Sequence, residues 1–405
     1  MEQVTITRLG HLGDGIAQGP VFVAQTLPGE VVEGEIDGER MIAPKIVTPS
    51  PDRVRPPCSH YKMCGGCALQ HASDDLVAGW KAEVVKTALT AQGLDAPITG
   101  IATSPARSRR RATLTGRRTK KGALVGFHAR ASDTVVDITD CHLLVPELMA
   151  MVPALRELTQ LAGSRKGEVQ YAMTSAAIGI DLSVTGAKPL DDDLWPQLAA
   201  FAEGHNLARL TWNGELIVTR NPPAQTFGGV PVVPPAGAFL QATDAGQAAL
   251  IDGVDRALAG AKRVADLFAG CGTFTFPLAR RADVTAVESD VPALSALDAA
   301  WRKATDLHQI RAEKRDLFRR PLMPDELRHF DGVVIDPPRA GCEAQVTELA
   351  ASDVPVIAAV SCNPVTFARD AAILVKGGYR LAWVQVVDQF RWSPHIEVVA
   401  QFIRD

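Results

Sequence analysis

Apolar and polar positions alternate with a short period in the first part of the chain. Up to about residue 50 they alternate in short runs, which glycine and proline separate, as at Gly13-Asp14-Gly15 and Leu27-Pro28-Gly29-Glu30. Such alternation is typical of half-buried strands. The expected strands are residues 4–6, 21–23, 31–32 and 41–42. Several short strands in this length predict a small β-barrel over residues 1–50.

The pattern between residues 51 and 235 is mixed. Residues 74–93 have helical periodicity with Gly93 as a stop signal, and residues 148–161 contain a second helical stretch. Residues 207–212 and 216–220 have the composition of short strands. The sequence therefore predicts a central α+β domain over residues 51–235.

From residue 236 onward, apolar runs alternate with helical stretches. The runs do not alternate with polar residues, as expected of strands that are buried on both faces of a parallel sheet. They occupy residues 263–268, 284–287, 333–335 and 356–360. The succession of strands and helices predicts an α/β fold class, with a Rossmann-like, doubly wound domain over residues 236–405.

Composition and charge restrict the classes of function. The 405 residues are 46% hydrophobic and have a formal net charge of −4, so the chain as a whole has no excess of positive charge for nucleic acid. The chain contains no apolar run of about 18 residues, and its first residues lack the pattern of a signal peptide. We therefore expect a cytoplasmic protein that does not associate with membranes.

One stretch departs from this balance, because it contains basic residues and no acidic residue. The basic residues are Arg107, Arg109, Arg110, Arg111, Arg117, Arg118, Lys120, Lys121 and Arg130. Thr113, Leu114 and Gly116 predict a hairpin, so that the charges would line a β-ribbon. Such a local surface suits a phosphate backbone, and a solvated hairpin without a ligand is the alternative.

Three of the seven cysteines are clustered. Cys58, Cys64 and Cys67 have the spacing C-x5-C-x2-C. In a chain without an export signal, this spacing indicates a metal site rather than disulfides. Three thiolates need a fourth ligand for tetrahedral zinc or for an iron–sulfur cluster, and Cys141 is the best candidate. The alternatives, if the metal is zinc, are His60, His71 and His142.

The strand at residues 263–268 ends in the small-residue turn 269–273. Glycines at this position let the chain approach a ligand closely at the start of a helix. The turn lacks the pattern G-x-G-x-x-G, which argues against NAD. Glu288 ends the next strand, where an acid can bind ribose hydroxyls, and Asp316 could face an adenine edge or be an ordinary surface acid. We predict an S-adenosylmethionine site, whose candidate residues here are Asp266, Gly270, Gly272, Glu288 and Asp316.

Chemistry is also predicted at the ends of the last two apolar runs. Cys362 directly follows the run at 356–360 and Ser361, and Asn363-Pro364 then breaks the chain. A thiol at the carboxyl end of a buried strand is a candidate nucleophile, and a structural cysteine is the alternative. Asp336 occupies the equivalent position after the run at 333–335.

Three segments together resemble the RNA uracil-5-methyltransferase family. They are Asp336-Pro337-Pro338-Arg339-Ala340-Gly341, Ser361-Cys362-Asn363-Pro364 and His395-Ile396-Glu397. In methyltransferases that act on exocyclic amines, the similar tetrapeptide ends in an aromatic residue. Here Arg339 takes that position, which favours methylation of carbon. Residues 13–17 and 21–30 also resemble the TRAM domain, an OB-like barrel appended to RNA-modifying enzymes, which implies RNA contact.

The resemblance implies a ribosomal-RNA uridine C5 methyltransferase of the 23S type. C5 of uracil is a poor nucleophile, so Cys362 would attack C6 and Glu397 would later remove the C5 proton. Gln241 is expected to contact S-adenosylmethionine, and Phe268 matches an aromatic position of the family. Asp336 would bind the base or help to orient the cofactor. In the branch that is most similar, three clustered cysteines and a later one hold a [4Fe-4S] cluster, here Cys58, Cys64, Cys67 and Cys141.

Other functions remain open on the sequence alone. A transfer-RNA uridine methyltransferase would use the same residues, a non-catalytic RNA-binding factor could retain the fold, and a redox enzyme would use the cluster directly. Glu397 could also be an ordinary surface acid. Residues 388–394 lack the proline that the family usually has after Phe390, so the family pattern does not predict the shape of this loop. The target uridine is expected to be single-stranded or flipped out.

Overall fold

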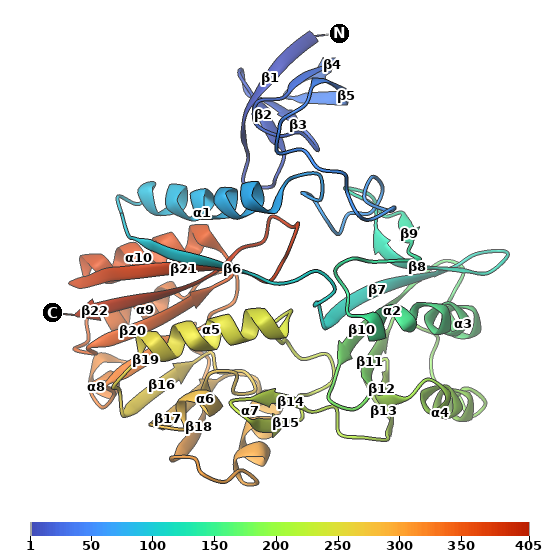
Figure 1. The fold of residues 1–405 in the computed structure, drawn as a ribbon. Helices are drawn as coiled ribbons and strands as arrows, with labels where there is room; N and C mark the ends of the chain where they lie inside the picture. The colour runs from blue at the N-terminus through green and yellow to red at the C-terminus, as the bar shows by residue number, and fades with distance from the viewer. Residues whose placement is uncertain (1, 405) are drawn as a thin grey trace.

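The computed structural model describes residues 2–404, which form a barrel and two large sheets (Figure 1). The barrel is closed, in the order β1-β2-β3-β5-β4, and confirms the expectation of a small β-barrel. Apolar side chains from alternate strand positions fill its interior, among them Ile6, Val23 and Val32. Its strands are β1 (Glu2–Leu9), β2 (Gly15–Ala17), β3 (Val21–Val23), β4 (Val31–Asp37) and β5 (Arg40–Thr48).

The central sheet has seven strands in the order β13-β12-β11-β10-β7-β8-β9. Strands β7 and β8 form the predicted hairpin, and the helices α2, α3 and α4 accompany this sheet. A two-stranded ribbon of β14 and β15 follows. The bounds are β7 (Arg111–Arg118), β8 (Ala123–His128), β9 (Val135–Asp137), α2 (Pro146–Ala150), α3 (Val152–Ala162), β10 (Glu168–Ser175), β11 (Ile180–Thr185), α4 (Leu194–Gly204), β12 (Leu207–Trp212), β13 (Glu215–Thr219), β14 (Gln225–Phe227) and β15 (Val230–Val232).

The second large sheet has eight strands in the order β18-β17-β16-β19-β20-β22-β21-β6. The first five are parallel, and β22 pairs antiparallel with both β20 and β21. This confirms the α/β, Rossmann-like prediction. The helix expected after the turn 269–273 is α6, which has only four residues. The bounds are α5 (Asp244–Ala257), β16 (Arg263–Leu267), α6 (Thr275–Leu278), β17 (Asp283–Glu288), α7 (Val291–Trp301), β18 (Ile310–Lys314), α8 (Pro324–Leu327), β19 (Gly332–Ile335), α9 (Glu343–Ala350), β20 (Val356–Ser361), α10 (Pro364–Lys376), β21 (Tyr379–Asp388) and β22 (Glu397–Arg404).

Two elements from the early part of the chain complete this sheet. Strand β6 (Ile98–Thr103) pairs parallel with β21 at the sheet edge, and α1 (Asp74–Thr90) lies beside α10 (Figure 1). Helix α1 begins where the Ser73 side chain caps the Leu76 N–H, and it buries Val85 and Leu89 in the core of the eight-stranded sheet. The sheet thus uses residues on both sides of position 235.

In the part of the chain that the structure describes, no helix has both the length and the apolar character that crossing a membrane requires.

Candidate active site

Cys362 and Glu397 meet at the carboxyl end of β20. The antiparallel register of β20 with β22 pairs Ser361 with Val398, so the next pair in this register is Cys362 with Glu397. Cys362 is half-buried, and the Glu397 side chain is buried, with the residue only 2% exposed. Asp336, at the end of the neighbouring parallel strand β19, faces the same group, because its charge affects both residues. The structure thus brings three predicted residues together.

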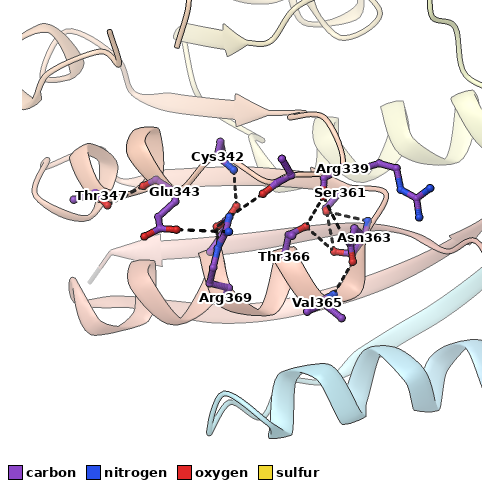
Figure 2. A network of polar contacts seen from close by, with 11 residues as sticks. Arg339, Cys342, Glu343, Thr347, Ser361, Asn363, Val365, Thr366 and Arg369 are labelled. Carbon is purple, nitrogen blue, oxygen red and sulfur yellow. Dashed lines mark hydrogen bonds and ion pairs between the residues drawn. The ribbon is translucent and has the colours of Figure 1, made fainter. Parts of the chain in front are cut away.

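The chain around Cys362 is held by a network of polar contacts (Figure 2). The Asn363 side chain caps α10 by accepting from the Val365 N–H at 3.0 Å, and it donates to the Arg339 carbonyl at 3.1 Å. The Thr366 hydroxyl donates to the same carbonyl at 3.2 Å. These contacts join the loop after β19 to the start of α10. The Arg339 side chain extends away from the network in Figure 2 and is exposed.

The protonation states of this group follow from its burial. Desolvation, together with the charges of Glu397 and Asp336, raises the pKa of the Cys362 thiol to about 11, while Arg339 opposes this shift. Desolvation and Asp336 raise the pKa of Glu397 to about 8, against the lowering effects of Gln389 and Arg111. Both groups are therefore protonated at pH 7, and each must lose its proton before it can act as a nucleophile or a base.

A second pair of acids lies beneath the glycine turn. Desolvation and Asp266 raise the pKa of Asp336 to about 7, and desolvation raises that of Asp266 to about 7 as well. Asp266 is fully buried and accepts from the Thr275 hydroxyl at 2.5 Å through Oδ2. Its Oδ1 has no hydrogen-bond partner among residues 2–404. A buried carboxyl oxygen without a partner is costly, so it marks a position that a bound group could satisfy.

The predicted turn after β16 has the conformation that glycine permits. Gly270 and Gly272 have φ values of 55° and 96°, and an added Cβ at Gly270 would meet open space. Phe268 also has a positive φ, 64°, which is strained for an aromatic residue. The Glu288 carboxylate accepts from the Gly270 N–H at 3.0 Å, which places the acid directly beside the turn.

Sequence reasoning missed one neighbour of this turn. Phe318 lies beside Phe268, with ring centroids 5.5 Å apart, and is 48% exposed. The Asp316 side chain accepts from the Phe318 N–H at 3.0 Å and thereby holds the turn that presents this ring. The signal in the sequence was an aromatic residue two positions after the predicted Asp316, because flat apolar faces stack on bases.

Gln241 is joined to the group by a second residue that sequence reasoning missed, Gln389. Gln241 is 3% exposed, and its side-chain oxygen accepts from the Gln389 amide at 2.6 Å. The same amide donates to the carboxyl of Glu397. Nothing in the local pattern around Gln389 indicated this role, since Gln241 lies 148 positions away in the sequence.

Comparison with known proteins identifies the family to which this chain belongs. The model of the tRNA (uracil-5-)-methyltransferase family matches residues 235–404. An RNA methyltransferase of Brucella suis biovar 1, described as uncharacterized, is 44% identical over 98% of this chain and 97% of its own. The 23S rRNA (uracil(1939)-C(5))-methyltransferase RlmD of Chromohalobacter salexigens is 35% identical over 99% of this chain and 89% of its own. The chain belongs to the RNA uracil-5-methyltransferase family.

The fold of this family member is shared with a solved structure of another protein. The tRNA (uracil-54, C5)-methyltransferase of Pyrococcus abyssi, in complex with S-adenosyl-L-homocysteine, superimposes with a TM-score of 0.79. The match covers 99% of both chains at 22% sequence identity, so it shows a shared fold.

The basic stretch at residues 107–130 of this methyltransferase is buried in one part and exposed in another. Arg110 is 6% exposed and bonds Gln241, Asp244 and Gln247, while Arg111 donates to the Leu240 carbonyl at 2.5 Å. The expectation that these charges line a β-ribbon surface is therefore wrong for this pair, because their guanidinium groups bind the protein itself. The basic residues exposed at or near the hairpin turn are Arg117, Lys120 and Lys121.

The predicted metal ligands line one cavity of about 520 Å³. The thiols on it are those of Cys58, Cys64, Cys67 and Cys141. His60 lines it too, whereas the His71 ring pairs with the Tyr61 hydroxyl at 2.6 Å and is absent from the cavity lining. Among residues 2–404, no three His, Cys, Asp or Glu side chains are arranged to hold a metal ion.

Burial raises the pKa of three of these thiols, so each is neutral without a cation; they are Cys64, Cys67 and Cys141.

Proposed function

We propose that this enzyme methylates C5 of a uridine in 23S-type ribosomal RNA. The observation that carries the proposal is the meeting of Cys362, Glu397 and Asp336 at the carboxyl ends of β19 and β20. The ribosomal substrate is supported by the similarity to RlmD, which spans nearly the whole chain. A cytoplasmic location belongs to the same proposal.

The chemistry assigns a separate role to each side chain. The Cys362 sulfur attacks C6 of the uracil ring, and the C5–C6 electron pair becomes an enolate that makes C5 nucleophilic. S-adenosylmethionine supplies the methyl group that C5 takes. Glu397 then removes the C5 proton, and the returning electrons expel the Cys362 thiolate. Asp336 binds the base or orients the cofactor, and Arg339 favours the thiolate by its charge.

The residues at the carboxyl ends of β16 to β19 fit S-adenosylmethionine. The open space above Gly270, the orphaned Oδ1 of Asp266 and the carboxylate of Glu288 beside the turn suit a polar nucleoside group. The exposed Phe318 ring adds an apolar face. The proposed cofactor-binding residues are Gln241, Asp266, Phe268, Gly270, Gly272, Glu288, Asp316 and Asp336.

We further propose that the four cysteine thiols hold a [4Fe-4S] cluster. Four thiols are the donor set that such clusters use. All four line the same cavity, of about 520 Å³, which supports a shared ligand. The cluster would be structural, because no proposed step consumes electrons. The barrel, which we take to be TRAM-like, would contribute RNA contacts.

The cluster assignment is tested by purifying the protein without oxygen. We expect about four irons and four sulfides per chain and a brown colour, all lost in Cys141→Ala. A colourless protein with one zinc per chain would contradict the assignment.

The catalytic proposal is tested with ribosomal RNA fragments that contain 5-fluorouridine, incubated with S-adenosylmethionine. Fluorine cannot leave as a proton does, so the reaction should stop with protein bound covalently to RNA. We expect a band that survives denaturing electrophoresis and is absent in Cys362→Ala. No adduct on RNA that demonstrably binds would refute the C5 mechanism for that RNA.

Transfer RNA is the second candidate substrate, favoured by the family description and by the Pyrococcus abyssi structure. Parallel assays with purified ribosomal and transfer RNA distinguish the two. Methylation of transfer RNA alone would exclude the ribosomal proposal.

A further inference from the structure

Gln389 bonds to three partners at the centre of the site. The residue is 2% exposed and directly follows β21. Its Nε2 donates to Gln241 Oε1 at 2.6 Å and also to Glu397 Oε2. Its Oε1 accepts from the Ala242 N–H at 2.6 Å. An amide offers two N–H donors and one oxygen, so these contacts use both donors and the oxygen.

The segment that Gln389 contacts is itself fixed by the central domain. Arg110 donates to the Gln241 carbonyl at 3.2 Å, and Arg111 donates to the Leu240 carbonyl. Gln389 therefore connects the carboxyl of Glu397 to a backbone segment that arginines of another sheet hold in place. A side chain in such a connection fixes the direction in which the Glu397 carboxyl faces.

Helix α5 packs closely against the Gln389 side chain. A Cβ built on Gly246, in the first turn of α5, would lie 2.6 Å from Gln389 Cβ and 3.1 Å from its Oε1. The first distance is shorter than real Cβ contacts and the second is tight, so a methyl group at position 246 requires the Gln389 side chain or the start of α5 to shift. The absence of a side chain at Gly246 thus makes room for this orientation of Gln389.

We propose that Gln389 is a positioning residue for the general base, whose amide aligns Glu397 and favours its ionised form. The inference rests on the proposed function, in which Glu397 removes the C5 proton. The other groups that face Glu397 are Asp336 after β19, Arg111 on β7 and Cys362 after β20. Gln389 differs from these groups, because it is an uncharged amide that donates a hydrogen bond to the Glu397 carboxyl.

The test separates the step that needs the base from the steps that do not. Adduct formation on 5-fluorouridine RNA requires attack and methyl transfer, whereas turnover on uridine RNA also requires removal of the proton. For Gln389→Met we expect adduct formation within about threefold of wild type and turnover reduced ~10- to 100-fold. The rising limb of kcat/KM against pH should move to higher pH, because the ionised carboxyl loses a donor.

A second variant protects the test from a folding defect. Gly246→Ala should shift the pH limb in the same direction, although alanine favours the helix. Gln385→Met is the matched control: it makes the same substitution on β21, the strand that Gln389 directly follows, at a side chain that accepts from the exposed Arg256. It should change neither turnover nor the pH limb.

Two results would overturn the assignment of Gln389. If Gln389→Met has the same turnover as wild type and the same dependence of kcat/KM on pH, the amide does not position the base. Equal losses of adduct and turnover would show a merely structural residue. Absence of any adduct with the wild-type enzyme would instead refute the proposed function, so the two failures are distinguishable.

Discussion

Glu397 is a buried carboxyl group, and its surroundings disfavour its ionised form. Burial and the nearby Asp336 raise its pKa to about 8, and the thiol opposite it has a pKa of about 11. In the proposed mechanism both groups act after losing a proton, so low pH should inhibit the reaction. We expect kcat/KM to rise with pH through about 8, measured by methyl transfer to RNA between pH 6 and 9.5.

The expected profile has a clear contrary result. A plateau that begins at pH 6 would show that Glu397 is already ionised in the free enzyme. Glu397→Asp keeps a carboxyl group but places it farther from the substrate. It should reduce the rate, while kcat/KM should still rise with pH.

The same carboxyl should cost stability at high pH. Its pKa is raised above the unfolded value, so the folded state binds the proton more tightly. Its contribution to stability is fully present below about pH 4.5 and is lost as pH rises towards 8. Glu397→Gln should therefore be more stable than wild type at pH 8, on the order of 2 kcal/mol, and closer to it at pH 5.

Urea unfolding at both pH values measures this difference. Glu203→Gln changes an exposed glutamate on α4 and should show no such pH dependence. A Glu397→Gln protein that is less stable than wild type at pH 8 would contradict the assigned protonation.

At this scale the sequence predicted the chemistry of single residues better than their connections. Asp336 and Cys362 follow the ends of buried strands, so the pattern of buried runs located them, whereas Glu397 was indicated by the family resemblance. Gln389 could not be found in this way, because its bonds to Gln241 and Ala242 join positions almost 150 residues apart.

At the scale of elements, the loop between β21 and β22 depends on helix α1. The buried ammonium of Lys81 donates to Asp388 at 2.5 Å and to the carbonyls of Phe390 and His395. On its other side, the Trp392 carbonyl accepts from the Ala68 N–H at 2.8 Å, next to Cys67. The loop that leads into Glu397 is thus held by α1 and by the cysteine segment.

Removal of the Lys81 ammonium should therefore be costly. Lys81→Met leaves the buried Asp388 charge and two carbonyls without their partner, for an expected loss of about 3–5 kcal/mol in the free energy of unfolding. Denaturant unfolding monitored by circular dichroism measures this. Lys86→Met, an exposed position on the same helix, should change stability by less than about 0.5 kcal/mol.

A double variant shows whether the charge or the packing matters. Lys81→Met with Asp388→Leu removes both charges, so it should be more stable than Lys81→Met alone. A loss below 1 kcal/mol in the single variant would contradict a buried ion pair.

The elements themselves were largely predictable, and the uses of their charges were not. Alternation predicted the barrel strands β1, β3, β4 and β5 but not β2, and apolar runs predicted the parallel strands β16, β17, β19 and β20. Thr113, Leu114 and Gly116 predicted the β7–β8 hairpin. The basic stretch suggested a surface, but the guanidinium groups of Arg110 and Arg111 bind a segment some 130 residues later. Charge patterns along a chain do not show which charges have long-range partners.

At the scale of the whole molecule, the eight-stranded sheet is incomplete without the early part of the chain. A fragment of residues 236–405 would lack β6 on the edge of β21 and α1 over α10, and would expose the apolar surface that Val85 and Leu89 cover. We expect this fragment to aggregate or to unfold without cooperativity. Thermal unfolding followed by circular dichroism measures this.

Residues 51–405 are the matched comparison for that fragment. They retain α1 and β6, and should unfold cooperatively, although Leu69 and Trp80 lose the barrel residues Leu9 and Leu27 that pack against them. Cooperative unfolding of residues 236–405 alone would show that the sheet does not need its early elements.

The pairing of β6 with β21 also determines the order of events during synthesis. Lys81 and Asp388 are 307 positions apart, so at ~5–20 residues per second α1 and β6 wait roughly 15–60 s for their partners. Through this interval the nascent chain carries a strand with a free edge, which is the kind of segment that chaperones shield. Cys362 is also translated before Glu397, so the growing chain contains the proposed nucleophile before the proposed base. The proposed site is therefore complete only after residue 397 has been synthesised.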